Sequence, residues 1–322
     1  MSSDTPPPVT LSDMPVLVLE KVVGKSDLVD CLALQKVCVN FRSLIHSTTL
    51  HCDKVHFRFE DYFATVTLGN LDLEYDEIRT GGCRVTSKRF DSIKTHVDTR
   101  SFKETMITDA LSFLKKPNLR IGRLIVDVFN NAVMRKFSEF LMLHNVKLNV
   151  RSIHNRYTPS IHPILHLLNP ASLEEIIFEH SHFSLYEFNE IAEMDQQWKA
   201  KTSLQRCLIP NEVGIEQYLK FKKVRMPLVS RRVMLTDENL VKLRDNLPGS
   251  SHLEFLLLRN APDYRESFDA MNRRLDKIMS EDAAYDASTR RFLISNSRDY
   301  FQLRLEKEFG DVILTIQRVL NN

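Results

Sequence analysis

A recurring spacing of apolar residues, Leu-x-x-Leu-x-Leu, most constrains what this chain can fold into. The spacing occurs five times between residues 121 and 258, and a sixth, imperfect copy surrounds Val233. Between successive copies, apolar residues recur at helical spacing, for example at Leu185, Phe188 and Ile191. A strand, helix, strand order at these distances requires parallel strands joined by right-handed crossovers. The sequence therefore predicts an α/β fold.

The period of this pattern narrows the prediction. The central apolar positions of the copies lie 22 to 31 residues apart, and they are Leu124, Val146, Ile176, Cys207, Val233 and Leu256. Leucine-rich repeats have a period of about 20–29 residues, so we expect a leucine-rich-repeat-like α/β arc over residues 98–260. An open array of repeats needs its last face covered, and residues 261–322 have the pattern of a helix followed by strands. We expect them to form a C-terminal helix and β cap.

Two other patterns precede the repeats. Within residues 9–50, apolar residues at helical spacing predict a module of three short helices, with Pro15 in the first turn of the first helix. Between Val55 and Tyr75, apolar and polar residues alternate, which predicts a β-hairpin and linker segment over residues 51–97 that joins the module to the repeats. A module of about 40 residues buries too little apolar surface to be robust alone. We therefore expect the N-terminal module to pack on a partner or on a neighbouring domain.

Composition excludes several classes of function. Only 8 of the 322 residues are glycine, and none falls in a phosphate-binding loop or nucleophile-elbow pattern, so we expect no cofactor and no catalysis. The 44 basic and 42 acidic residues nearly cancel and no RNA-binding motif is present, which makes nucleic acid an unexpected partner. We interpret the basic stretch from Lys220 to Arg225 as a solvated helix face.

The five cysteines form no C-x-x-C pair, and no secretion signal or membrane span is evident. We expect a cytoplasmic or nuclear protein, or one found in both compartments, with no membrane partner.

The titratable residues do not form a recognisable catalytic or metal site. His162 and His166 could share one helix face, but Pro163 follows His162 and no H-E-x-x-H pattern occurs, so we expect no metal. Cys207 occupies a buried repeat position, which favours an inert core thiol. We interpret His180 and His182 as surface or capping residues. The four carboxylates could converge across adjacent strands but lack a general-base partner, so we interpret them as solvated charges, and they are Asp127, Glu174, Glu175 and Glu179.

The first 45 residues resemble an F-box, especially the nematode type. The resemblance rests on Leu-Ser-Asp-Met-Pro at 11–15, Val-Leu-Glu-Lys-Val-Val at 18–23 and the patterned stretch 27–45. Leu17 departs from the family pattern, because many F-boxes carry Glu beside the proline. The resemblance implies that a Skp-type adaptor, and through it a cullin, binds this module. The contact residues that it implies are Leu11, Met14, Pro15, Val37 and Phe41. The alternative is that the module is only a helical cap on the following domain.

The repeat region resembles the FTH, or FOG-homology, region of the large nematode F-box A family. The resemblance rests on Leu-Glu-Glu-Ile-Ile-Phe at 173–178 and Gln-Trp-Lys-Ala-Lys at 197–201. It implies a non-catalytic substrate-recognition subunit of an SCF-type cullin-RING ubiquitin ligase, in which the second region binds a target protein. Two alternatives stay open. The chain could be a non-degradative adaptor that holds an RNA-regulatory or other protein, or an undetected hydrolase, which would need a pocket of convergent titratable groups.

One column of residues is the candidate target-binding surface. In each Leu-x-x-Leu-x-Leu strand, the residue between the last two apolar positions points to the opposite face of the sheet. This column comprises Ile125, Lys147, Ile177, Leu208, Met234 and Leu257, and Arg259 lies on its polar margin. An exposed apolar strip of this kind marks a partner site. The alternative is that the strip is covered, because parallel sheets are commonly buried on both faces.

Overall fold

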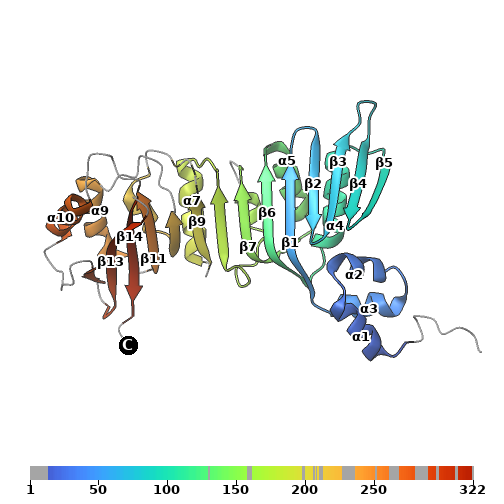
Figure 1. Cartoon of the computed structure of the whole chain (residues 1–322), viewed down its shortest axis with the longest axis horizontal. Helices are drawn as coiled ribbons and strands as arrows, with labels where there is room; N and C mark the ends of the chain where they lie inside the picture. Colours follow the sequence, from blue (N-terminus) through green and yellow to red (C-terminus); the bar gives the residue numbers. More distant parts are fainter. Residues whose placement is uncertain are drawn as a thin grey trace, which may run out of the picture. The chain divides into compact units, whose positions relative to one another are not determined.

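The computed structural model describes residues 14–129, 131–157, 162–197, 200–205, 207, 209, 213–226, 236–250, 252–260, 268–279, 289–294, 297–308 and 311–320. The chain is divided into two compact units. The first comprises Met1–Ile125 with Ala132–Val150, and the second comprises Val126–Asn131 with Arg151–Asn322. Both units contain helices and strands, which confirms the predicted α/β class (Figure 1).

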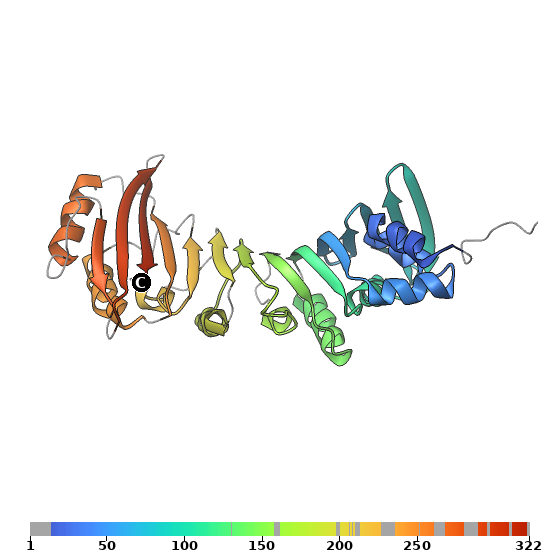
Figure 2. The same cartoon turned by 90° about the horizontal axis from the view of Figure 1, so that it is seen from below.

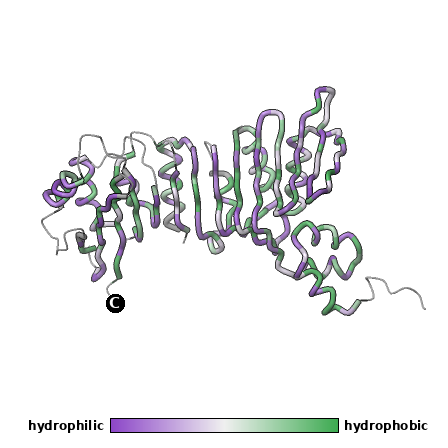
Figure 3. The backbone as a smooth tube through the Cα atoms, viewed as in Figure 1, coloured by the Kyte–Doolittle hydropathy of each residue, from purple (hydrophilic) through white to green (hydrophobic). Residues whose placement is uncertain are grey.

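The first unit begins with the predicted three-helix module, which consists of α1 (Val16–Lys25), α2 (Leu28–Leu34) and α3 (Val39–Ser47). Pro15 occupies the N-cap of α1, and the Asp27 carboxylate caps α2 by accepting a hydrogen bond from the Asp30 N–H at 2.8 Å. Figure 3 shows apolar stretches along these helices. Their buried apolar residues form the core of the module, and they are Leu19, Val23, Leu28, Cys31, Phe41 and Ile45.

Five antiparallel strands follow the module. They are β1 (Leu50–Phe59), β2 (Phe63–Leu68), β3 (Leu71–Glu77), β4 (Cys83–Arg89) and β5 (Ser92–Asp98). The alternation of apolar and polar residues places one face of β1 and β2 in the core, where Phe57 and Phe59 pack against Phe113 and Phe137. Those two aromatic residues come from α4 (Phe102–Leu114) and α5 (Asn131–Leu143). With β6 (Leu119–Val128), the strand order of the unit is β6-β1-β2-β3-β4-β5.

The second unit contains parallel strands, as the repeat pattern predicts, but one of them, Lys223–Met226, lies where a helix face was expected. They are β7 (Asn149–Arg156), β8 (Glu175–Glu179), β9 (Lys201–Gln205), β10 (Lys223–Met226) and β11 (Phe255–Asn260), paired in that order. Between them lie α6 (His162–Leu165), α7 (Leu185–Gln197), α8 (Ile215–Tyr218), α9 (Asp237–Asn246) and the 3₁₀ turn Leu247–Gly249. These helices cover one face of the strands (Figure 2), as right-handed crossovers require. The central apolar positions Ile176 and Leu256 are buried on that face.

The end of the second unit is antiparallel. After α10 (Phe268–Met279), the chain forms β12 (Thr289–Leu293), β13 (Tyr300–Glu308) and β14 (Asp311–Val319). Strand β14 returns beside β11, and β13 and β12 continue the sheet, so that its order is β12-β13-β14-β11-β10-β9-β8-β7. The helix and strands predicted within 261–322 are therefore present.

Two predicted strand copies are misplaced, and the sixth copy, around Val233, lies outside the described residues. Leu143 ends α5 and is 75% exposed, because Asn145 adopts a left-handed backbone (φ 51°) that terminates the helix and turns the chain. The strand that follows, β7, begins six residues after Leu143 at Asn149. Similarly, β9 ends at Gln205, before the predicted centre at Cys207.

Candidate functional site

The N-terminal module exposes a group of large apolar side chains. We call this group the N-terminal apolar face, and it consists of Met14, Val16, Leu17, Val18, Val37 and Val39, which are 37–72% exposed. Pro15, between Met14 and Val16, is exposed as well. Single exposed apolar residues are ordinary, but such a concentration on a small module is typical of a protein-binding surface. The predicted contact residues Met14, Pro15 and Val37 lie on this face, whereas Leu11 lies outside the described residues.

Phe41, one of the predicted adaptor contacts, is buried in the structure. Its side chain is 0% exposed and belongs to the core that joins the three helices. It stabilises the module and does not form part of its exposed surface. The exposed apolar residue at the start of α3 is Val39, one position after the N-cap Cys38. Hydrophobic spacing alone did not distinguish these two residues, because both lie on the same short helix.

Charged side chains attach the module to the five-stranded sheet. At the end of β4, Arg89 donates through Nη1 to Asp30 Oδ1 at 2.7 Å and through Nη2 to Asp27 Oδ2 at 2.8 Å. Burial alone would raise the pKa of Asp27, but the hydrogen bonds from the Asp30 N–H, Arg89 and Asn70 outweigh it and lower the pKa. The module thus packs on the neighbouring strands, as expected of so few residues, while the N-terminal apolar face stays exposed.

A second attachment lies at the C-terminal end of the module. Asn118 donates through Nδ2 to the carbonyl oxygens of Ile45 and His46, at 3.0 and 3.2 Å, and also to the Thr48 carbonyl. These carbonyls belong to the last turn of α3 and the residue that follows it, where helix carbonyls have no intrahelical partner. Lys116 donates to Gln35 Oε1 at 2.8 Å. Together with Arg89, these contacts hold the helices at three places on the unit.

The described residues include four of the six members of the predicted target column. On the strand face opposite the helices, Ile177 and Leu257 are half-buried, and the strand pairings align them with Ser203 and Arg225 in one row. Arg259 is also half-buried. The solvent exposure of these three side chains is thus intermediate between that of an open strip and that of a covered strip.

The other members of the column differ from the expectation. Ile125 is 6% exposed, so it is a buried residue of β6 and does not form an open strip. Lys147 is exposed, but it lies in the turn before β7 because the repeat copy there is shifted. Leu208 and Met234 lie outside the described residues.

An aromatic ladder, Phe129, Tyr157 and His180, stands at the carboxyl ends of β6, β7 and β8. The ring centroids of Phe129 and Tyr157 are 4.9 Å apart, and those of Tyr157 and His180 are 5.2 Å apart with an interplanar angle of 3°. Phe129 and Tyr157 are exposed and His180 is half-buried. Ligands of open α/β sheets bind outside the carboxyl ends of parallel strands, which makes the ladder a candidate contact site.

The backbone at the ladder repeats one conformation. Tyr157 and His180 each follow the last residue of a strand, and each has a left-handed backbone, with φ of 60° and 53°. The Tyr157 N–H donates to the Glu179 carbonyl at 3.2 Å, and the His180 N–H donates to the Gln205 carbonyl at 3.0 Å. Such conformations cost energy in residues other than glycine, and the stacked rings offset part of that cost.

Glu179 organises the charged residues beside the ladder. Its Oε2 lies 3.0 Å from both His154 Nε2 and Arg156 Nε, and its Oε1 lies 3.8 Å from His180 Nε2. Burial and the positive charge of Arg156 lower the pKa of His154, although Glu179 and Asp127 act in the opposite direction. Glu179 is thus an ion-pair partner and not a solvated charge, while Glu174 pairs with Arg151 at 2.7 Å.

The ladder was not found by sequence reasoning. The signal that was available is a residue type, since an aromatic or imidazole ring follows three consecutive strands of the repeat. The predicted solvated helix face also needs correction, because Lys223–Met226 is strand β10. Lys222 and Lys223 there pair with Glu254 at 3.1 and 2.9 Å.

Among the described residues, no group of three or more His, Cys, Asp and Glu side chains is arranged to hold a metal ion. Burial raises the pKa of Cys207 to about 12, which keeps its thiol protonated and unreactive. None of the helices in the described ranges is long and apolar enough to cross a membrane.

Comparison with known proteins adds three findings. Residues 11–53 match the F-box domain family, and residues 131–273 match the FTH domain family. The chain is also similar to F-box A protein 224 of Caenorhabditis elegans, with 23% identity over 269 residues, which cover 80% of this chain and 68% of that protein. The F-box match contains the N-terminal apolar face, and the FTH match contains Tyr157, Ile177, His180 and Leu257.

Proposed function

Because this chain belongs to the nematode F-box A family, with an F-box domain followed by an FTH domain, we propose that it is the substrate-recognition subunit of an SCF-type ubiquitin ligase. In this role the chain is a non-catalytic adaptor. Its F-box binds a Skp-type adaptor that connects it to a cullin, and its FTH domain binds a target protein. All five cysteines are unpaired, which fits the reducing cytoplasm or nucleus, where we place this activity.

The observation that carries the proposal is the N-terminal apolar face. A module with only six buried apolar residues exposes as many large apolar side chains on its surface. Burying apolar surface contributes roughly 25 cal/mol per Å², so covering this face with a partner stabilises both the complex and the module. The Arg89 and Asn118 attachments leave the face free, because they contact the polar ends of α2 and α3.

We place target recognition on the second unit. The strand face opposite the helices carries Ile177, Arg225 and Leu257 in one row, and the aromatic ladder stands at the carboxyl ends of neighbouring strands. Large aromatic and arginine side chains are the residues that contribute most at protein interfaces. The leucine-rich-repeat-like arc remains our interpretation of the strand and helix alternation, and it supports this placement, since repeat arrays bind partners along their strands.

Co-purification with a Skp-type adaptor tests the proposal. The double variant Pro15→Ala with Val37→Asp changes two exposed residues of the N-terminal apolar face, and we expect it to lose the adaptor while it remains folded. The matched control is Tyr62→Asp, which changes an apolar residue that is 75% exposed in the turn between β1 and β2. The control should bind like the natural chain. Adaptor binding by the double variant at the natural level would refute the assignment of this face.

The target surface is tested separately. Replacing Ile177 and Leu257 with Ser alters half-buried side chains of the row, and we expect target binding to fall while adaptor binding is kept. The matched control is Leu293→Ser, an exposed residue of β12. If the row variant keeps every partner that the natural chain binds, target recognition lies elsewhere.

A further inference from the structure

Strand β5 is an edge strand that is exposed on both faces. It ends the strand order of the first unit, and six of its seven residues are exposed. The exposed residues include Ile93 at 66% and Val97 at 67%. Natural edge strands are usually protected by charged side chains, proline, a bulge or very short length, and Lys94 is the one such charge in the middle of β5. Strand β5 has seven residues, no proline and an unbroken register with β4 from Arg89↔Ser92 to Cys83↔Asp98.

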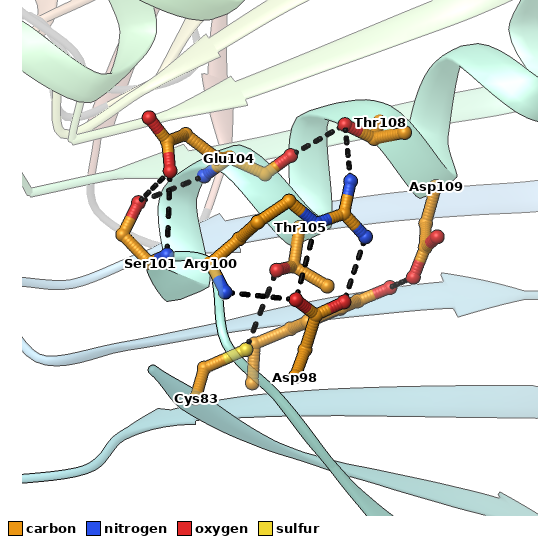
Figure 4. Close-up of polar contacts among 9 residues, drawn as sticks. Cys83, Asp98, Arg100, Ser101, Glu104, Thr105, Thr108 and Asp109 are labelled. Atoms are coloured by element: carbon orange, nitrogen blue, oxygen red, sulfur yellow. Dashed lines mark hydrogen bonds and ion pairs between the residues drawn. The ribbon is translucent and has the colours of Figure 1, made fainter. Parts of the chain in front are cut away.

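The strand is also held in place before any partner binds. Asp98 accepts from Arg100 Nη2 at 2.7 Å and from the Arg100 backbone N–H at 2.8 Å, and Arg100 Nη1 donates to Thr108 Oγ1 of α4 at 3.2 Å (Figure 4). Gly82 fixes the same end, because a Cβ there would lie within 2.4 Å of the Asp98 carbonyl oxygen. A preorganised strand loses little conformational freedom when another strand adds to it.

The sequence of the strand is symmetric about Thr95. Two positions away on either side stand the apolar residues Ile93 and Val97, and one position away stand Lys94 and His96. In an antiparallel pair of two copies centred on Thr95, each Ile93 would lie opposite Val97 of the other copy. Apolar β-branched pairs of this kind stabilise adjacent strands.

The backbone has the same symmetry. Arg89 and Ser92 close a two-residue hairpin, and the closing pair of such a hairpin directs its backbone groups toward the partner strand. The side to which the backbone N–H and C=O groups point alternates from one residue to the next. The groups of Ser92 point toward β4, so those of Ile93, Thr95 and Val97 point away from it. These are the residues that the symmetric register brings together, and each pair can exchange two hydrogen bonds.

We propose that β5 pairs antiparallel with β5 of a second copy of this chain, centred on Thr95, and that the chain self-associates as a two-fold dimer. A two-fold interface requires a self-complementary surface, which the strand provides in both its side chains and its backbone. The interface is small, and Lys94 would lie opposite His96 of the other copy. The dimer is therefore weak and forms at high protein concentration.

Sedimentation of the full-length chain over a wide concentration range tests this proposal. Thr95→Pro removes an N–H that faces away from β4, so it blocks the dimer and keeps the β4 pairing. Ile93→Lys with Val97→Lys places like charges around the two-fold axis. We expect each change to weaken self-association at least about tenfold, which is 1.4 kcal/mol. The control Tyr62→Lys alters a similarly exposed side chain, 75% exposed, away from the edge and should dimerise normally.

One variant should act in the opposite direction. Lys94→Thr replaces a charge that pairing would partly remove from water with a β-branched residue that favours strands, and we expect it to strengthen self-association several-fold. Circular dichroism of every variant verifies the fold. The proposal is overturned if the natural chain stays monomeric at all concentrations, or if Thr95→Pro and the double lysine variant self-associate as well as the natural chain.

Discussion

The contrast between Phe41 and Val37 gives the sharpest prediction about the F-box. Phe41 is 0% exposed and Val37 is 57% exposed, although they are only four positions apart in the chain. Replacing a buried Phe with Ala costs about 3–5 kcal/mol, and a core as small as that of α1–α3 rarely contributes more than about 3–5 kcal/mol in total. Phe41→Ala should therefore unfold the module. Val37→Asp changes a surface residue and should alter its stability by less than about 0.5 kcal/mol.

Hydrogen exchange measured by mass spectrometry separates the two effects. In Phe41→Ala, amide protection should be lost across α1–α3 but kept across β1–β4, because these strands have their own core around Phe57 and Phe59. In Val37→Asp, protection should be natural in both regions. Both variants should lose the Skp-type adaptor, the first through unfolding and the second through the surface. Natural protection of α1–α3 in Phe41→Ala, or its loss in Val37→Asp, would refute this reasoning.

Three further predictions concern the first unit. Gly82→Ala should destabilise the chain by more than about 2 kcal/mol in thermal melts, because φ is 81° and the new Cβ would meet a backbone oxygen. The control Gly24→Ala lies in open space near the end of α1, and it should be neutral or stabilising by up to about 1 kcal/mol. Arg89→Met should increase hydrogen exchange in α2 and lower stability by about 1 kcal/mol, because its ion pairs are partly exposed to solvent. Hydrogen bonds from Arg100 lower the pKa of Asp98 to about 2, so the contribution of this pair is complete above the ordinary carboxyl pKa of about 3.9 and is lost as the pH falls through about 2. A carboxyl titration by NMR that places Asp98 near 4 would contradict it.

Strongly periodic segments could be predicted from the sequence. The Leu-x-x-Leu-x-Leu copies that begin at Ile121, Leu173 and Leu253 lie at β6, β8 and β11. The apolar positions of these copies are buried in the structure, so the spacing identified the strands correctly. The copy at Leu143 failed for a local reason. The left-handed Asn145 ends α5 there, and the same apolar residues fit the end of a helix as well as a strand.

The candidate contact surfaces were predictable to different degrees. Met14, Pro15 and Val37 are exposed as expected, because the F-box resemblance carried information on which side of short helices faces outward. The resemblance could not separate Phe41 from its neighbours, since burial on a short helix depends on the other two helices. The aromatic ladder depends on left-handed turns at Tyr157 and His180, and this backbone conformation is uncommon in residues other than Gly, although Asn, Asp and His adopt it more often than Tyr does.

Symmetric edge pairing could also be foreseen only in part. The alternation that predicts β strands was visible between Val55 and Tyr75, but strand β5 was not foreseen, and its position at the edge follows from the order β6-β1-β2-β3-β4-β5. Sequence alone does not reveal which strand ends a sheet. The near-palindrome around Thr95 acquires meaning once that edge is known to be open.

Quantitative mass spectrometry of proteins bound to the full-length chain, with proteasomes inhibited, tests the central claim most directly. The natural chain is compared with the Pro15→Ala, Val37→Asp variant and with the Ile177→Ser, Leu257→Ser variant. We predict that the first variant loses the Skp-type adaptor and cullin but keeps a target, and that the second loses the target but keeps the adaptor. The target should carry ubiquitin only with the natural chain. Retention of the adaptor by the first variant, or ubiquitin on the target regardless of the variant, would contradict the assignment of this chain as a substrate-recognition subunit.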